Sequence, residues 1–386
     1  MTPAARVQAA IEVLDRVLAG EAAEKALTGW ARASRFAGSK DRAAVRDHVF
    51  DALRSMRSFA ARGGGQTGRG LMLGALRAGG AALETLFTGT GYAPAPLNDT
   101  ELSAGRDPAP GPEALDLPDW LWPLWQESLG DAAALCARAL QHRAPVHLRV
   151  NAARMDRETA RVRLADEGIA TEPHAAAPHA LTVLEGARRI RQSAAFAEGL
   201  VELQDAASQA VVAALPLREG MRVLDYCAGG GGKALAMAAR TRLELVCHDA
   251  DPRRMRDLPA RAARAGIAVD LGPPQGLFDL VLADAPCSGS GAWRRAPEGK
   301  WLLTPEGLGR LTRLQDEVLD QAARRAGPEG VLAYATCSVL RAENEDRVDA
   351  FTRRHPGWSV IEQRRWPIDA AHDGFFLALL TRTTRG

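Results

Sequence analysis

From residue 201 onward, short apolar stretches with the composition of β-strands alternate with helical stretches, and this alternation restricts the fold more than any other feature. Strands separated by helices form a parallel sheet that is covered on both faces. Ligands of such a sheet bind at the carboxyl ends of the strands, near the point where the strand order reverses. We therefore predict an α/β domain whose chemistry follows directly after its strands. The predicted strands are residues 222–226, 243–249, 267–271, 278–283, 330–336 and 375–380.

The first 87 residues have the apolar spacing of helices. In residues 7–18 and again in residues 44–56, apolar side chains recur every three or four positions, as on one face of a helix. Residues 88–118 hold six prolines and little apolar periodicity, which indicates a linker between domains. We therefore expect a small helix bundle that is followed by a domain boundary.

Residues 119–199 mix the two element types. Helical patterns at residues 120–129 and 159–167 stand beside strand patterns at residues 146–150 and 180–184. This mixture predicts a small α+β subdomain ahead of the larger sheet. The predicted segments are a helical domain at 1–87, a linker at 88–118, an α+β subdomain at 119–199 and the sheet domain at 200–386.

Composition restricts where such a chain works. No uncharged apolar stretch reaches the roughly 20 residues that a membrane-spanning helix needs, and the N-terminus lacks the apolar core of a signal peptide. The five cysteines include no Cys-x-x-Cys pair, so neither a disulfide framework nor a zinc site is expected. We predict a cytoplasmic protein with free thiols, without a metal and without a membrane partner.

Charge is unevenly distributed along the first third of the chain. Residues 25–77 carry 11 cations and three acids, whereas residues 78–131 carry one cation and nine acids. A basic block of this kind is typical of a surface that binds a polyanion such as RNA. It is equally typical of a solvated, arginine-rich helical surface, and charge alone leaves both interpretations open.

The first predicted strand of the sheet domain ends in Asp225 and runs into four consecutive glycines, residues 229–232. Glycines let the backbone approach a ligand closely, and the following helix offers its N-terminal amides. A Walker loop is excluded, because Ala234 follows Lys233 where Ser or Thr would bind magnesium. The glycines formally fit a dinucleotide fingerprint or an S-adenosylmethionine loop. A second acid at a strand end, Asp249, favours the latter, since carboxylates bind a cationic amine or a ribose diol.

Two cysteines close predicted strands. Cys287 follows the strand that ends near Asp284, and Cys337 follows the next strand along the chain. Adjacent strand ends lie about 5 Å apart, so both thiols can reach one cleft. A thiol with a pKa of ~8.5 is only slightly ionised at neutral pH, and an electropositive setting increases the nucleophilic thiolate. The candidate cations nearby are Lys233, Arg294, Arg295 and Lys300.

Three motifs follow one another in the sheet domain: Cys-Ala-x-x-Gly-Gly-Lys at 227–233, Asp-Ala-Pro-Cys-Ser-x-x-Gly at 284–291 and Ala-Thr-Cys-Ser at 335–338. Their order and spacing resemble the RsmB/NOP/Sun family of S-adenosylmethionine-dependent RNA cytosine-5 methyltransferases. Residues 148–151 are similar to the family's pre-catalytic subdomain, and residues 38–43 resemble the NusB-like RNA-binding domain of its bacterial rRNA enzymes. The resemblance implies a Rossmann-like class I methyltransferase sheet of seven mostly parallel strands, preceded by an α+β subdomain and an all-α NusB-like domain.

The resemblance also implies a reaction, namely methyl transfer from S-adenosylmethionine to carbon 5 of a cytosine in RNA. It makes Cys337 the nucleophile that adds to carbon 6, and Cys287 the thiol that assists proton loss and release of the RNA. Asp284, protonated or hydrogen-bonded, would hold ring nitrogen 3. The implied substrate is small-subunit rRNA ahead of tRNA, bound by a monomer. The implied cofactor-binding residues are Cys227, Ala228, Gly229, Gly230, Gly231, Gly232, Lys233, Asp249, Arg254, Asp270 and Asp284.

Other functions fit the sequence less well. A non-catalytic RNA-binding ribosome-assembly factor with this fold would have no need for both cysteines. A nicotinamide-dependent oxidoreductase likewise gives no reason for two cysteines at strand ends. Amino-methylating enzymes of the same fold commonly carry Asn/Asp-Pro-Pro-aromatic after the fourth strand. Residues 284–287 read Asp-Ala-Pro-Cys instead, which favours carbon methylation.

Overall fold

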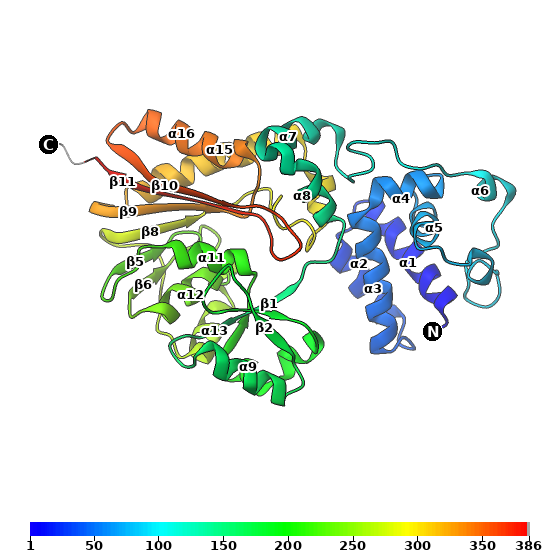
Figure 1. Cartoon of the computed structure of the whole chain (residues 1–386), viewed down its shortest axis with the longest axis horizontal. Coiled ribbons are helices and arrows are strands. Elements are labelled where there is room, and N and C mark those ends of the chain that lie inside the picture. The colour runs from blue at the N-terminus through cyan, green and yellow to red at the C-terminus, as the bar shows by residue number, and fades with distance from the viewer. Residues whose placement is uncertain (384–386) are drawn as a thin grey trace. The chain divides into compact units, whose positions relative to one another are not determined.

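The computed structural model describes residues 1–383 and divides the chain into two compact units (Figure 1). Unit 1 is built from three separate stretches of the chain, and unit 2 from the rest. The stretches of unit 1 are Met1–Gln126, Gly130–Arg143 and Trp293–Leu302. Within the described residues, no helix has both the length and the apolar character that crossing a membrane requires.

Unit 1 is helical. The apolar periodicities predicted at residues 7–18 and 44–56 are confirmed, and the second ends where one helix gives way to the next at Ser55. These faces meet in one core, in which Leu14 and Leu53 are fully buried. Each such burial contributes about 1.5–3 kcal/mol. The main helices are α1 (Pro3–Leu18), α2 (Ala23–Ala33), α3 (Ser39–Arg54), α4 (Met56–Gly63) and α5 (Gly68–Ala78).

The segment predicted as a linker, residues 88–118, is folded onto these helices. It contains the short helix α6 (Asp99–Ser103). Glu101 pairs with Arg69 of α5 at 2.5 Å, and the fully buried Asp116 accepts two hydrogen bonds from a serine of α4. The structure therefore differs from the predicted linker, because side chains of the helices satisfy polar groups that a proline-rich segment leaves unpaired.

Two further stretches of unit 1 come from beyond its predicted end. The first holds α8 (Ala133–Leu140) and most of α7 (Trp122–Leu129), whose last three residues belong to unit 2; the sequence placed both helices in the α+β subdomain. The second is residues 293–302, which the sequence placed in the sheet domain. In that stretch Lys300 is buried and donates to the backbone carbonyl of Arg54 at 3.0 Å. A buried ammonium bonded to α3 therefore ties this stretch to the helices.

Unit 2 contains a small antiparallel sheet in the order β2-β3-β1-β4. The strands predicted at residues 146–150 and 180–184 are confirmed, and so is the helix predicted at residues 159–167. The two remaining strands are too short for an alternating pattern to show in the sequence. The elements are β1 (Val146–Val150), α9 (Arg157–Asp166), β2 (Thr171–Pro173), β3 (Ala180–Val183), α10 (Ala194–Ala197) and β4 (Val201–Leu203).

The larger sheet of unit 2 has seven strands in the order β10-β11-β9-β8-β5-β6-β7. The last strand, β11, is antiparallel to both of its neighbours, β10 and β9. The five strands β9, β8, β5, β6 and β7 pair in parallel. The predicted mostly parallel, seven-stranded sheet is thus confirmed. Its strands are β5 (Arg222–Asp225), β6 (Glu244–Cys247), β7 (Asp270–Leu271), β8 (Phe278–Asp284), β9 (Ala326–Thr336), β10 (Trp358–Trp366) and β11 (Phe375–Arg382).

Helices cover both faces of this sheet (Figure 1). Alternate residues of a strand point to opposite faces, so Val223 packs with α11 and α12, whereas Leu224 packs with α15 and α16. The strand order reverses between β5 and β8, which marks their carboxyl ends as the expected ligand site. The helices are α11 (Ala206–Ala214), α12 (Gly232–Arg240), α13 (Leu258–Ala265), α15 (Pro305–Ala323) and α16 (Glu345–Arg354).

Candidate active site

The glycine-rich loop joins the end of β5 to the start of α12. Gly229 and Gly231 have φ angles of 48° and 77°, which are left-handed conformations that favour glycine. A Cβ atom on Gly231 would lie 1.8 Å from a methyl carbon of Leu258. Both conformation and space therefore require glycine here, and α12 begins at Gly232 with its free amides at the carboxyl edge of the sheet.

Asp225 closes β5 beneath this loop and is fully buried. Burial, and then the charge of Asp284, raise the pKa of Asp225 to about 7. Its Oδ1 atom has no hydrogen-bond partner among the described residues. An unpaired carboxyl oxygen beside glycine amides fits a ligand with a cationic amine, as S-adenosylmethionine has. The sequence pointed to Asp225, as to Asp249, as a strand-end acid that can bind a cationic amine or a ribose diol, although the resemblance did not include it among the cofactor-binding residues.

Asp249 lies against the loop, as expected, and is almost fully buried. Its Oδ2 atom accepts a hydrogen bond from the Gly229 amide at 3.0 Å and pairs with Arg254 at 3.0 Å. These contacts make Asp249 and Arg254 a support for the loop. Asp270, the predicted adenine-side acid, begins the edge strand β7 and is exposed. Cys227 and Ala228 begin the loop after β5. Burial raises the pKa of the Cys227 thiol, and Ala228 is buried.

Lys233 and Asp284 form an ion pair between α12 and the end of β8. The lysine Nζ atom lies 2.6 Å from Asp284 Oδ2 and 5.0 Å from the centre of the Phe375 ring. Burial, the largest single cause, lowers the pKa of Lys233, but the charge of Asp284 and its hydrogen bond, together with Cys337 and Asp225, raise it by more, so the net shift is upward. The lysine therefore stays charged at neutral pH, next to the strand ends that carry the two cysteines.

The two strand-end cysteines meet. Cys287 Sγ lies 3.4 Å from Cys337 Sγ, close enough for one sulfur to donate a hydrogen bond to the other. This confirms the expectation that neighbouring strand ends bring both thiols to one place. The hydrogen bond that Cys287 shares with Cys337, followed by burial, raises the pKa of Cys287 well above its ordinary value. The other cations considered from the sequence, Arg294, Arg295 and Lys300, belong to unit 1.

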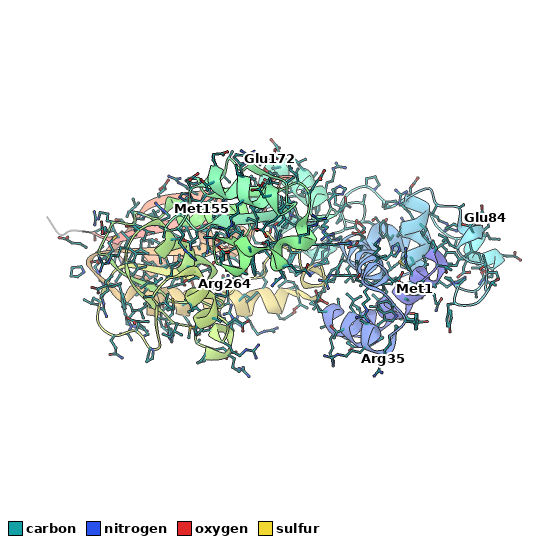
Figure 2. The ribbon with its side chains drawn as sticks, turned by 90° about the horizontal axis from the view of Figure 1, so that it is seen from below. Met1, Arg35, Glu84, Met155, Glu172 and Arg264 are labelled. Atoms are coloured by element: carbon teal, nitrogen blue, oxygen red, sulfur yellow. The ribbon has the colours of Figure 1, made fainter. Side chains whose placement is uncertain are left out.

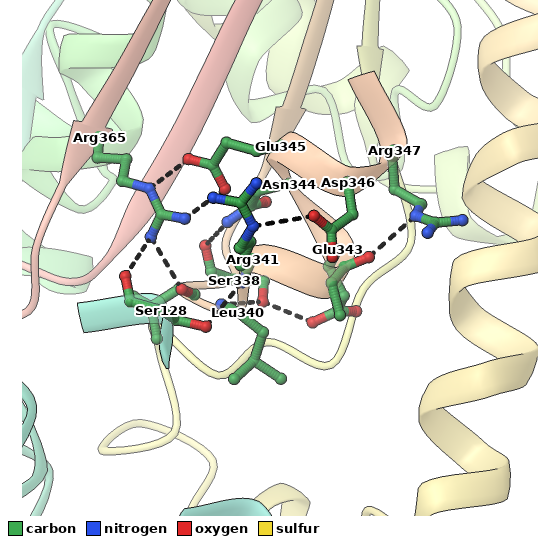
Figure 3. A network of polar contacts seen from close by, with 12 residues as sticks. Ser128, Ser338, Leu340, Arg341, Glu343, Asn344, Glu345, Asp346, Arg347 and Arg365 are labelled. Atoms are coloured by element: carbon green, nitrogen blue, oxygen red, sulfur yellow. Dashed lines mark hydrogen bonds and ion pairs between the residues drawn. The ribbon is translucent and has the colours of Figure 1, made fainter. Parts of the chain in front are cut away.

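A network of polar contacts holds the segment that follows Cys337 (Figure 3). At its surface, Arg365 pairs with Glu345 and Arg341 pairs with Asp346. At its centre, Glu343 is fully buried and accepts hydrogen bonds from both cysteine-bearing loops. The sequence does not reveal this burial, because it depends on residues far away in the chain.

Two family models match the chain. One, described as "16S rRNA methyltransferase RsmB/F", matches residues 212–381. The other, described as "Methyltr_RsmF/B-like, ferredoxin-like domain", matches residues 117–190. The first range contains the glycine-rich loop and both cysteines, and the second contains most of the small antiparallel sheet.

Known proteins are similar over much of the chain. "Ribosomal RNA small subunit methyltransferase B" from Vibrio cholerae is 35% identical over 283 residues, which are 69% of this chain but only 65% of that relative. The crystal structure of PH0851 superposes with a TM-score of 0.77 at 22% identity and covers 99% of both chains. NSun6 from Pyrococcus horikoshii, solved with SFG, has a TM-score of 0.60 at 18% identity and covers 69% of this chain and 98% of its own. The solved structures show a shared fold. The family models and the curated relatives show the family: the chain belongs to the RsmB/NOP/Sun family.

Proposed function

We propose that the chain transfers a methyl group from S-adenosylmethionine to carbon 5 of a cytosine in small-subunit rRNA, through a covalent cysteine adduct. The observation that carries this proposal is the 3.4 Å approach of Cys287 and Cys337 at the carboxyl edge of the sheet. A carbon that must be activated by addition of a thiolate explains two sulfurs in one site. The rRNA substrate is inferred from the names of the relatives, about two thirds of whose length the chain matches.

The residues of the glycine-rich loop would hold the cofactor, as the resemblance to the family implies. When bound, S-adenosylmethionine supplies an electrophilic methyl group on a sulfonium sulfur. Asp225 would take its cationic amine, because that carboxylate has an unpaired, buried oxygen beside the loop. Asp249 and Arg254 would keep the loop in shape, and Asp270 is retained as the adenine-side acid. The neighbour solved with SFG, an S-adenosylmethionine analogue, supports this choice.

Cys337 is the proposed nucleophile. Its thiolate sulfur forms a bond to carbon 6 of cytosine, and the electron pair of the C5–C6 double bond moves to carbon 5, which takes up the methyl group. A proton carried by the Lys233–Asp284 pair would form a hydrogen bond to ring nitrogen 3 and so hold the base during this addition. Cys287 then removes the proton from carbon 5, the C5–C6 double bond re-forms, and Cys337 leaves as a thiolate. Cys287 gives its own proton to water before it takes the one from carbon 5, so both thiols return to their starting state and one proton passes to the solvent for each methyl group transferred.

Unit 1 is proposed to bind the RNA, in the manner of the NusB-like domain that it resembles. Arg32, Arg35 and Lys40 are exposed around the turn between α2 and α3, and none forms an ion pair with a described residue; Figure 2 labels Arg35 at an outer turn. Next to them, Phe36 is 68% exposed and stacks on Tyr92 with ring centres 6.2 Å apart. Unpaired cations and exposed rings are what phosphates and unstacked bases bind.

The test is methylation of rRNA and tRNA in vitro, with bisulfite sequencing to locate modified cytosines. Cys337→Ala should abolish methyl transfer, and Cys287→Ala should accumulate a covalent protein–RNA species on a denaturing gel. Cys136→Ala is the matched control, because that buried cysteine lies in unit 1. Turnover by Cys337→Ala would contradict the nucleophile assignment, and a chain that binds RNA without methylating it would favour the assembly-factor alternative.

A further inference from the structure

Glu343 is a buried carboxylate that the reaction described above does not use. It is 0% exposed and accepts four hydrogen bonds, all from neutral donors. Its Oε1 atom accepts from the Ser288 amide at 2.8 Å and from Gln315 Nε2 at 3.0 Å. Its Oε2 atom accepts from the hydroxyls of Ser288 and Ser338, both at 2.5 Å. Four donors bond to this one carboxyl group, so the side chain is held at a fixed place inside the protein.

The two serines that bond to Glu343 each follow a cysteine of the pair. Ser288 follows Cys287, Ser338 follows Cys337, and the carboxylate bonds to both of them. Gln315 of α15 also donates to the Pro286 carbonyl at 2.9 Å, so the residues on both sides of Cys287 are held. On the other loop, the Thr336 hydroxyl bonds to the Asn344 side chain at 2.6 Å. The separation of the two sulfurs is thus set by residues outside the sheet.

The charges around the sulfur pair are unequal. The negative charge of Glu343 is one of the causes that raise the pKa of Cys287, after its hydrogen bond to Cys337, burial and the charge of Cys337. On the other side, Lys233 interacts electrostatically with Cys337, while being paired with Asp284. The remaining titratable group is Tyr334, which is buried and whose pKa burial raises, so it stays neutral.

We propose that Glu343 is a positioning residue of methyl transfer: it ties the Cys287 loop to the Cys337 loop, and its charge keeps the proton of the pair on Cys287. The proposal rests on the proposed function only for its consequence, since the contacts themselves need no substrate. It gives two chemically identical residues different roles: Cys337 attacks the base, and Cys287 keeps its proton until later in the reaction.

The same arrangement allows Cys287 to act later as a base. Once Cys337 Sγ has bonded to carbon 6, it is neutral and no longer stabilises the Cys287 proton. The two contributions of Cys337 to the raised pKa of Cys287 then disappear, so Cys287 gives its proton to water more readily than in the free protein. The resulting thiolate takes the proton from carbon 5. When Cys337 leaves, the original distribution of one proton over two sulfurs returns, so the step balances.

Glu343→Gln separates charge from position. The glutamine has the same shape, and its oxygen can accept from the Ser288 amide and Gln315. Its amide can donate to the two serine hydroxyls, which turn to accept. Glu343→Ala also removes the hydrogen bonds that tie the two cysteine-bearing loops together. Glu345→Gln is the matched control, because it makes the same change two residues away, where the carboxylate pairs with Arg365.

The first measurement is alkylation of the free protein by iodoacetamide, with each cysteine quantified by mass spectrometry. We expect Cys337 to react faster than Cys287 in the unchanged protein. Glu343→Gln should shift the Cys337-to-Cys287 ratio toward Cys287 by about tenfold, which corresponds to a relative pKa change of about one. Glu345→Gln should leave the ratio unchanged. A wild-type ratio in Glu343→Gln overturns the charge part of the proposal.

The second measurement uses a bifunctional alkylating probe that fluoresces when it has bridged two thiols. Glu343→Gln should retain bridging of Cys287 and Cys337, and Glu343→Ala should lose it while its circular dichroism stays native. If Glu343→Ala does not fold, Ser338→Ala, which removes one donor, should lower bridging instead. Wild-type bridging in both variants overturns the positioning part. Neither assay contains RNA or a methyl donor, so failure of the proposed function would leave both results readable.

Discussion

Lys233→Met removes the ammonium group that lies 2.6 Å from Asp284 and keeps most of the side-chain volume. The lysine side chain is 10% exposed and the aspartate side chain 29% exposed, so the pair is largely shielded from water. At that separation and an effective dielectric constant of about 20, the Coulomb attraction is about 6 kcal/mol. Desolvation of the two charges offsets several kcal/mol of it. We expect a net coupling of about 2 kcal/mol, since Asp284 keeps part of its hydration.

The coupling is measured by a double-mutant cycle of Lys233→Met, Asp284→Asn and the double variant. Amide hydrogen exchange of peptides from β8 and α12 reports the local opening free energy of this part of unit 2 alone. The matched control is the cycle on Arg163 and Glu198, which pair at 2.7 Å with exposed side chains and should couple by less than about 1 kcal/mol. A Lys233–Asp284 coupling no larger than the control would refute the inference that this pair is a fixed part of the site.

Three further changes test other parts of the argument. Gly231→Ala should weaken cofactor binding and destabilise β5–α12 by several kcal/mol. Gly220→Ala is the control, because Gly220 has nearly the same φ of 78° but a Cβ atom there would have no atom within 4 Å. It should lower the free energy of unfolding in urea by only about 1–2 kcal/mol. Phe36→Ala and Tyr92→Ala should lower RNA affinity without changing its salt dependence, while neutralising the neighbouring cations should flatten that dependence in a binding titration. Because Asp225 has a pKa of about 7, calorimetric affinity for S-adenosylmethionine should rise as the pH increases through 7, and Asp225→Asn should abolish that rise. The same raised pKa makes the free energy of unfolding decrease as the pH rises from about 4 to 7, since in this range the folded state binds more protons than the unfolded state.

The central strands could be predicted from the sequence because they are buried on both faces. β5 and β8 sit in the middle of the sheet, and most of their residues are buried around a short apolar stretch that the sequence shows. β10 was missed, since it is an edge strand whose residues are mostly exposed, and its pattern looks like a polar connection. β7 is shorter than predicted for a related reason: as the other edge strand it pairs with one neighbour only. Pattern strength thus follows burial.

The candidate site was predictable to the extent that its residues close strands. Cys287 and Cys337 lie where a parallel sheet must bring them, and the structure places their sulfurs together. Glu343 could not be found in this way, because its burial comes from Ser288 and Gln315, which are 55 and 28 positions away. The membership of residues 293–302 in unit 1 was hidden for the same reason, since its contacts with α3 span more than 240 positions.

The sheet explains why the two sulfurs meet, but it does not explain why they would differ. Parallel neighbours present equivalent positions at their carboxyl ends, so β8 and β9 alone would give two similar thiols. The difference comes from elements that pack beside the sheet: α12 brings the positive charge of Lys233, and the turn before α16 brings the negative charge of Glu343. A proton shared across 3.4 Å moves toward the negative side of such a field. In the proposed mechanism, the motifs therefore locate the chemistry, and the charges off the sheet decide which cysteine attacks.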